Sequence, residues 1–160
     1  MAHDSPMVEC GCSPPEEIFL LGLSHHTASL AIRETFTFEK GEVEVVLRHI
    51  SHKRHLDEVA LIATCNRTEI LGVGPAGLDH RARILDAMAE LGKGPGSRAL
   101  PSLYELYDEE AATHLFRVIA GLDSRSIGEP EIFGQVKGAY GAACRAGTAG
   151  SILHKLFHWA

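Results

Sequence analysis

The chain has 160 residues and a formal net charge of −6, which is enough for one domain with a packed core but not comfortably for two. No apolar run approaches the roughly 20 residues that a membrane-spanning helix needs, so we expect no membrane partner. The negative charge argues against broad, sequence-independent nucleic-acid binding, which depends on neutralising many phosphates, but not against contact with an RNA end. The N-terminus has no basic region followed by an apolar stretch, which favours a cytoplasmic protein.

The first half of the chain alternates between strand-like and helix-like patterns. Residues 1–16 have no periodicity and are predicted to be a disordered leader, and the apolar run 18–23 predicts a strand. Apolar residues then recur at i, i+3, i+4 and i+7 between Val43 and Ile50, which indicates an amphipathic helix. Two short apolar runs, 59–63 and 70–73, predict a hairpin with a longer-than-minimal loop.

A second helix and a fourth strand follow the predicted hairpin. Asp79 is expected to cap this helix, and residues 103–107 suit a strand. The apolar face of the helix is expected to comprise Ala82, Leu85, Met88 and Ala89. The resulting order, β-α-β-β-α-β, is that of ferredoxin-like domains. We therefore predict an α+β fold, in which a ferredoxin-like βαββαβ sheet is followed by additional C-terminal helices.

The last 50 or so residues carry helical patterns. Asp108 is expected to cap a helix whose apolar stripe extends to Leu122, and Glu129–Pro130 is expected to open another, with proline in the first turn. Three glycines of the second helix indicate close backbone packing: Gly134, Gly138 and Gly141. Ser151 starts a final apolar helix that has no terminating signal. We expect that the chain was cut from a longer protein, with one domain at 17–147 and the start of a connecting helix at 148–160.

Of the four cysteines, Cys65 has the most informative surroundings. It lies in a polar turn between two apolar runs, where we expect the thiol to be accessible, and Arg67 follows two residues later. A neighbouring positive charge favours the reactive thiolate. Cys144 lies among alanines in a helical pattern and is expected to be a core residue. Cys10 and Cys12 resemble half of a metal site, but no partner pair follows, so a mobile thiol-bearing tail is the better interpretation. We predict no metal site.

A second group of polar residues begins at His114 and continues in the loop that starts at Gly121. Taken alone, His114 is most simply a partly buried histidine whose ring is hydrogen-bonded to a carbonyl. The loop Gly121–Ser124 is most simply a helix end, and this would remain true if a ligand also used it.

Together these segments closely resemble glutamyl-tRNA reductase, which starts the five-carbon route to tetrapyrroles. The similarity runs in order from Gly22 to about Phe157 and covers the N-terminal catalytic domain of that family, with the first turns of the connecting helix. The matching segments are Gly22–Ala28, Ile32–Glu34, Thr64–Glu69, His114–Val118, Ala120–Ser124, Gly128–Ile132 and Gly134–Lys137.

The resemblance implies a thioester mechanism. Cys65 would attack the ester carbonyl of glutamyl-tRNA, the tRNA hydroxyl would leave, and hydride from NADPH would reduce the glutamyl thioester to glutamate 1-semialdehyde. His114 would act as the acid/base or carbonyl-polarising group. Glu69 would have a positioning role, and Glu131 stands where many members carry glutamine. The residues implied to bind or position the substrate are Thr64, Asn66, Arg67, Ser124, Glu129 and Gln135.

The same resemblance defines what the chain is expected to lack. No strand-bounded G-x-G-x-x-G occurs, so NADPH is expected to bind a domain absent from this chain, and the helical dimerisation domain is absent too. The expected partners are the acceptor end of glutamyl-tRNA, these two missing domains and the downstream aminomutase. Three alternatives stay open: a thiol hydrolase that deacylates aminoacyl-tRNA, a non-catalytic RNA-binding module and a plain interaction domain. The two hairpin strands carry no aromatic residue on which RNA bases could stack, which argues against the RNA-binding module.

Overall fold

A four-stranded antiparallel sheet forms the centre of the molecule, for which a computed structural model describes residues 14–39, 41–124 and 131–160. The strands are β1 (Glu16–Ser24), β2 (Glu58–Ala63), β3 (Arg67–Pro75) and β4 (Tyr104–Tyr107). Their order in the sheet is β2-β3-β1-β4, and every pairing is antiparallel. The predicted α+β fold with a ferredoxin-like sheet is therefore confirmed.

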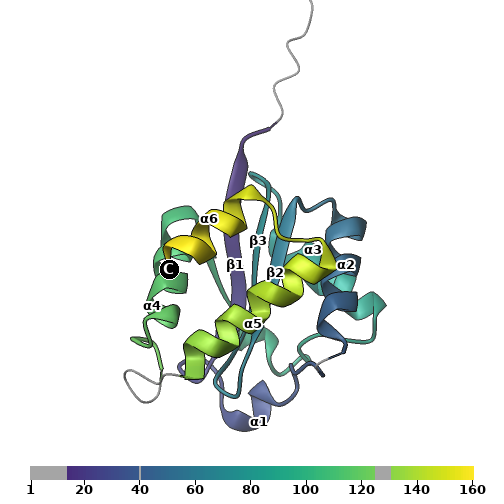
Figure 1. Ribbon diagram of the computed structural model, residues 1–160. Coiled ribbons are helices and arrows are strands. Elements are labelled where there is room, and N and C mark those ends of the chain that lie inside the picture. The colour runs from purple at the N-terminus through teal and green to yellow at the C-terminus, as the bar shows by residue number, and fades with distance from the viewer. Residues whose placement is uncertain (1–13, 40, 125–130) are drawn as a thin grey trace, which may run out of the picture.

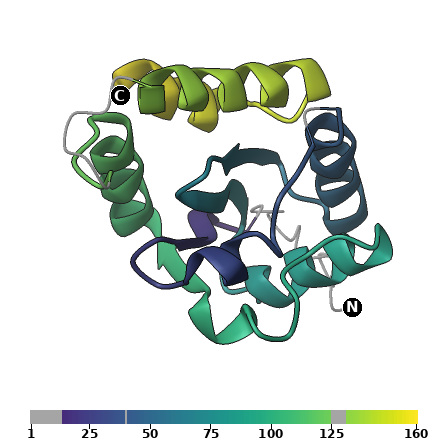
Figure 2. The same cartoon turned by 90° about the horizontal axis from the view of Figure 1, so that it is seen from below.

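Helices surround this sheet (Figures 1 and 2). They are α1 (Leu30–Arg33), α2 (Val43–Arg54), α3 (His80–Glu90), α4 (Asp108–Ile119), α5 (Glu131–Ala146) and α6 (Ser151–Trp159), with a short 3₁₀ turn at Leu100–Ser102. In Figure 1, α5 and α6 cross in front of the sheet, α4 lies beside β1, and α3 lies behind. No helix in the described part of the chain combines the length and apolar character needed to cross a bilayer.

The alternation of side chains along β1 divides the core between the two faces of the sheet. The Phe19 ring stacks on His80 at the start of α3, with ring centroids 4.2 Å apart. Gly22, three residues later, lies on the opposite face, next to Glu69 on β3. This second face carries the polar residues described below.

The apolar faces of α3 and α4 differ in part from the predicted stripes. Asp79 does cap α3, because its Oδ1 accepts a hydrogen bond from the backbone N–H of Ala82 at 2.9 Å. However, Ala82 itself is exposed, and α3 buries His80, Ile84, Ala87 and Met88. A helix anchored by its first residue against β1 is rotated relative to the face that the spacing alone suggested.

Helix α4 begins and ends differently from the prediction. Asp108 is the first helical residue and does not cap its own helix, because its Oδ1 accepts the backbone N–H of Ile18 on β1 at 3.0 Å. The helix ends at Ile119, and Gly121 follows with a φ of 70°. The chain therefore leaves the helical path before Leu122, which is 56% exposed rather than buried.

Two expectations for α5 are wrong. A Cβ atom placed on Gly134 or Gly138 would meet no heavy atom within 4 Å, so these glycines do not mediate close backbone packing. Cys144 is exposed rather than part of the core. The packed face of α5 instead includes the adjacent alanines Ala142 and Ala143, and Cys144 is directed outward because it lies one residue beyond them. Residues 129 and 130, expected to open this helix, lie outside the described residues.

The C-terminal helix α6 is attached to the free edge of β2. Thr148 pairs with Val59 through two hydrogen bonds of 2.8 Å each, one from the Val59 backbone N–H to the Thr148 carbonyl and one from the Thr148 hydroxyl to the Val59 carbonyl. The buried Glu58 carboxylate accepts the backbone N–H groups of Ile152 and Leu153 at 3.0 and 2.6 Å, in the first turn of α6. The start of α6 at Ser151 confirms the prediction, and its direction is set by contacts with a strand about 90 residues earlier.

At the other end of the chain, β1 begins at Glu16, two residues before the apolar run that predicted it. Residues 1–13 of the expected leader, with Cys10 and Cys12, lie outside the described residues.

Candidate functional site

The β2–β3 turn holds Cys65 at its tip. The Thr64 backbone N–H donates to the Arg67 carbonyl at 2.8 Å, and the Thr64 hydroxyl oxygen accepts the N–H groups of Asn66 and Arg67 at 3.1 Å each. These bonds fix a four-residue turn in which Thr64 and Asn66 are half-buried and Cys65 is exposed. The sulfur is therefore accessible on an ordered turn, as the pattern of the sequence predicted.

Arg33, at the end of α1, supports this turn from the other side. Its side chain is buried, its Nη1 donates to the Ala28 carbonyl at 2.8 Å, and its Nε donates to the Cys65 carbonyl at 3.3 Å. The sequence motif that contains Arg33 was recognised, but no role for this residue could be derived from it, because its partner lies 32 residues away.

Arg67 does not lie in the turn as a free cation beside the thiol. It is the first residue of β3 and is 1% exposed. Its guanidinium lies on the same face of the sheet as Glu69 and His114 of α4. Its Nη1 donates to Glu69 Oε1 at 2.9 Å, and its Nη2 donates to both the backbone carbonyl and Oδ2 of Asp123 at 2.7 Å. Its positive charge is therefore compensated by two carboxylates.

Ionic pairing determines the charge states inside this cluster. Burial lowers the pKa of the Arg67 guanidinium, but the charge of Glu69 and the hydrogen bond to Asp123 outweigh it, so the pKa is raised overall. Burial likewise raises the pKa of Asp123, and the hydrogen bond and charge of Arg67 outweigh it and lower the pKa. His26 lies 3.6 Å from the second Asp123 oxygen. Arg67 and Asp123 thus form a stable ion pair that fastens the loop after α4 to the start of β3.

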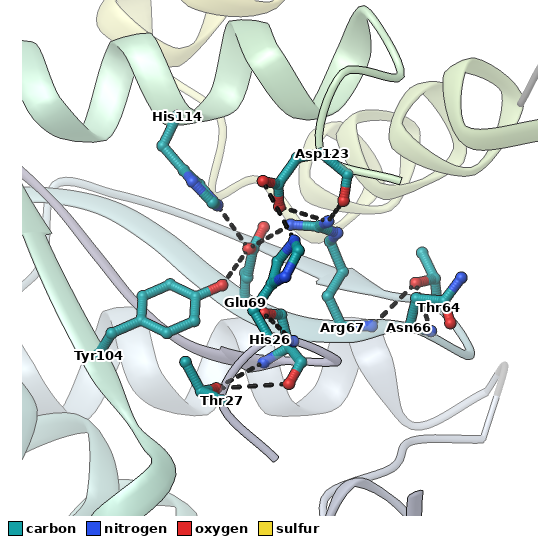
Figure 3. A network of polar contacts seen from close by, with 10 residues as sticks. His26, Thr27, Thr64, Asn66, Arg67, Glu69, Tyr104, His114 and Asp123 are labelled. Atoms are coloured by element: carbon teal, nitrogen blue, oxygen red, sulfur yellow. Dashed lines mark hydrogen bonds and ion pairs between the residues drawn. The ribbon is translucent and has the colours of Figure 1, made fainter. Parts of the chain in front are cut away.

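Glu69 connects this ion pair to His114 (Figure 3). Its carboxylate is fully buried, and Oε1 receives hydrogen bonds from Arg67 Nη1, from His114 Nε2 at 2.7 Å, and from the Tyr104 hydroxyl. Burial raises the pKa of Glu69, but the hydrogen bond from His114 and the charge of Arg67 together hold the pKa below its ordinary value. Burial and the nearby Glu69 charge raise the pKa of Tyr104, which stays protonated as a donor.

The ionised Glu69 also determines the tautomer of His114. A carboxylate can only accept hydrogen bonds, so His114 Nε2 must carry a hydrogen. In the neutral ring, Nδ1 is then left with its lone pair and can take up or return a proton. His114 is half-buried on α4, as the sequence interpretation expected, but its partner is a carboxylate rather than a backbone carbonyl.

A narrow pocket brings Cys65 together with most of the predicted substrate-binding residues. Its lining comprises Thr64, Cys65, Asn66, Arg67, Ser124, Glu131, Ile132 and Gln135. His114 is not among them: it lines a separate groove with residues of β4 and α4, including Glu110 and Arg117. The buried Arg67 and Glu69 side chains link the two sites by hydrogen bonds. Figure 3 shows them between His114 and residues Thr64 and Asn66 of the turn. Glu129 lies outside the described residues.

Asp123 and Tyr104 are the residues of this cluster that the sequence interpretation did not single out. Asp123 was part of a recognised motif, but its pairing with Arg67 spans 56 positions of the chain. Tyr104 lay in a predicted strand without any local signal of a polar role. Among the described residues, no three His, Cys, Asp or Glu side chains are grouped so that they could hold a metal ion.

Fold and site together define an α+β domain with a ferredoxin-like sheet, which presents an ordered, accessible thiol in a pocket next to a buried ionic cluster. Comparison with known proteins makes this class specific. The family described as "Glutamyl-tRNAGlu reductase, N-terminal domain" matches residues 21–160. The chain therefore belongs to the glutamyl-tRNA reductase N-terminal domain family.

Individual relatives agree with this family. The chain is 41% identical to a glutamyl-tRNA reductase of Aromatoleum aromaticum over 141 residues, which are 88% of this chain and 33% of the relative. It is 39% identical to the Listeria welshimeri protein of the same name, with 88% and 32% covered. Among solved structures, the glutamyl-tRNA reductase from Methanopyrus kandleri is similar with a TM-score of 0.68 and 32% identity, over 88% of this chain and 31% of that one. The chain thus spans about a third of the length of these relatives.

Proposed function

We propose that this chain is the glutamyl-accepting domain of an NADPH-dependent glutamyl-tRNA reductase in tetrapyrrole biosynthesis, and that Cys65 carries the glutamyl group as a thioester. The observation that carries the proposal is the accessible sulfur on a hydrogen-bonded turn, within a pocket that also contains Ser124 and Gln135. A thiol with these surroundings has the access that a nucleophile needs.

The proposed step exchanges an oxygen ester for a thioester. The Cys65 thiolate attacks the carbonyl carbon that links glutamate to the terminal ribose of the tRNA. A carbon–sulfur bond forms, the carbon–oxygen bond to the ribose breaks, and the ribose hydroxyl leaves after taking up a proton. The Thr64 hydroxyl accepts two backbone N–H groups and keeps its own proton free to donate to an oxygen of the reacting carbonyl.

The remaining site residues have roles that follow from their positions. Ser124, Asn66 and Gln135 offer neutral polar groups to the glutamate, and Glu129 remains a proposed contact from the resemblance alone. Arg67 is better suited to positioning Asp123 and its loop than to gripping the glutamate directly, because both of its terminal nitrogens already have partners. His114 is proposed to exchange a proton through Nδ1, with Glu69 as its positioning partner.

The residues that the structure describes do not fit a nicotinamide cofactor. Dinucleotide sites use a parallel sheet with a glycine-rich turn before a helix, whereas every strand pairing described here is antiparallel. We therefore propose that NADPH is bound by a part of the longer enzyme outside this chain, and no reduction step is assigned to residues of this chain. The acceptor end of glutamyl-tRNA, the remaining domains of the enzyme, the downstream aminomutase and a cytoplasmic location complete the proposal.

Intact-protein mass spectrometry tests the proposal. After incubation with glutamyl-tRNA, the wild-type chain should gain the mass of one glutamyl group, and Cys65→Ser should abolish the gain. Cys144→Ser is the matched control, because Cys144 is the other exposed thiol in the described residues and should leave the adduct intact. An adduct that persists in Cys65→Ser would refute the proposed nucleophile. In the presence of NADPH, formation of the semialdehyde by this chain alone would refute the proposed division between domains.

The same experiment distinguishes a thiol hydrolase. The exposed turn leaves the thioester open to water, so slow release of glutamate is expected from an acceptor domain that lacks its reductant. Rapid multiple turnover, without accumulation of the adduct, would favour hydrolysis as the activity of this site.

A further inference from the structure

Three residues on neighbouring strands lie side by side across the sheet. Gly22 on the central strand β1 is the register partner of Glu69 on β3 and of Tyr104 on β4. Register partners in an antiparallel sheet direct their side chains to the same face. Glu69 and Tyr104 are therefore separated by one strand, at a position of that strand that has no side chain.

The missing side chain at Gly22 makes their contact possible. A Cβ atom at Gly22 would lie 2.6 Å from Glu69 Cγ and 2.9 Å from the Thr68 carbonyl oxygen. The space above β1 is thus already occupied by the Glu69 side chain, which extends toward β4. Across this gap the Tyr104 hydroxyl reaches Glu69 Oε1.

We propose that Tyr104 is a positioning residue, which holds the Glu69 carboxylate in the orientation that hydrogen-bonds His114. The proposal rests on the proposed function, in which His114 exchanges a proton during thioester formation. It assigns to Tyr104 a role in that reaction without contact to the substrate.

Two features of the Glu69 carboxylate carry this inference. All of its hydrogen bonds converge on Oε1, while Oε2 is buried and has no partner among the described residues. The orientation of the carboxylate therefore depends on the donors at one oxygen. Arg67 approaches that oxygen from the side of Asp123, and Tyr104 approaches it from the opposite side, beneath His114 (Figure 3).

Tyr104 also contacts the His114 ring directly. The two rings meet edge to face, with centroids 5.7 Å apart and an interplanar angle of 65°. The ring of Tyr104 thus limits the movement of the His114 ring. Its hydroxyl limits the movement of the Glu69 carboxylate, to which His114 donates a hydrogen bond. Tyr104→Phe removes the second restraint and keeps the first, so it isolates the effect of the hydroxyl.

The matched control is Tyr107→Phe. Tyr107 lies on the same strand, and its hydroxyl donates to Glu105 at 2.9 Å, away from Glu69. Both variants lose one hydroxyl that is bonded to a carboxylate. Only Tyr104→Phe is expected to affect His114.

Two measurements on this chain decide the proposal. In single-turnover acylation at saturating glutamyl-tRNA, Tyr104→Phe should react about 10-fold more slowly, the size expected for one hydrogen bond to a charged group. The half-saturating concentration should stay within about two-fold of wild type, because Tyr104 does not line the Cys65 pocket. In ¹⁵N spectra, the chemical shifts of the two His114 ring nitrogens should indicate the Nε2–H tautomer in wild type and in Tyr107→Phe. In Tyr104→Phe they should move toward the values of a mixture of the Nε2–H and Nδ1–H tautomers.

Replacement of Tyr104 by a ring-fluorinated tyrosine, which keeps the hydroxyl, should restore both the rate and the spectrum. The fluorinated variant also serves as the test of the proposal if Tyr104→Phe does not fold. Unchanged ring nitrogens and an unchanged rate in Tyr104→Phe, an equal loss in Tyr107→Phe, or failure of the fluorinated residue to restore the wild-type values would overturn the proposal. Absence of any adduct in the wild type would instead refute the proposed function, while the ring spectra would still test the positioning role of Tyr104.

Discussion

Removal of the Glu58 carboxylate should loosen α6 from the sheet and destabilise the domain by about 3 kcal/mol. Glu58 is 5% exposed, and its carboxylate accepts two backbone N–H groups, of which the Leu153 bond at 2.6 Å is buried. A hydrogen bond to a charged group contributes about 1.5–3 kcal/mol to stability. A buried N–H group that loses its acceptor has no compensation for its lost contact with water. Two such bonds, taken at the lower limit because α6 is near the surface, give about 3 kcal/mol for Glu58→Ala.

Thermal and urea unfolding followed by circular dichroism measure this effect. For a domain of this size, a loss of about 3 kcal/mol corresponds to a midpoint lower by about 6–12 °C. Glu58→Gln keeps the volume of the side chain but only one accepting oxygen, so it should lose about half as much. Glu44→Ala is the control, because Glu44 pairs with Arg145 at the surface and such pairs contribute at most about 1 kcal/mol. If Glu58→Ala were no less stable than Glu44→Ala, capping of α6 by Glu58 would be refuted as a source of stability.

Two further predictions concern the same cap and the buried cluster. Gly150→Ala would place its Cβ about 2.6 Å from Glu58 Cδ and displace the carboxylate, so it should destabilise the domain about as much as Glu58→Ala. In unfolding experiments, the double variant should be no less stable than Glu58→Ala alone. Additive losses of stability would contradict the shared mechanism. The pKa of Glu69 is lowered on folding, since burial raises it but the hydrogen bond from His114 and the charge of Arg67 outweigh that effect. Its contribution is therefore present above the unfolded value of about 4.5 and is lost as the pH falls through the lower folded value. The difference in unfolding free energy between wild type and Glu69→Gln should accordingly narrow as the pH is lowered from about 6 to 3, and a difference that widens would contradict the assigned direction.

The sequence predicted the elements of this fold well because their signals are local. Two short apolar runs on either side of a polar turn located the hairpin around Cys65, and the capping signal at Asp79 located the start of α3. The glycines of α5 were misinterpreted because a glycine permits close packing, but does not show that another segment packs against it. Cys144 was misplaced for a related reason: alanines occupy both faces of a helix, so an alanine-rich context does not distinguish core from surface.

The site was only partly predictable, because its charges are paired over long separations. Arg67 in a polar turn predicts exposure, yet its partner Asp123 lies 56 residues later, and His114 reaches Glu69 across 45 residues. The motifs identified the participating residues, but not which of them neutralise one another. Accessibility of Cys65, by contrast, follows from the turn itself and was predicted correctly.

The pairing of Thr148 with Val59 also bears on how copies of this chain behave when crowded together. An unpaired outer strand is a template for another chain, because its open amide and carbonyl groups can recruit a foreign strand. On the β2 side, Thr148 in the segment that leads into α6 already pairs with the open backbone groups of Val59. On the opposite side, β4 offers only four residues, Tyr104–Tyr107, too short a row for strong strand addition. The segment before the last helix thus blocks strand addition at Val59.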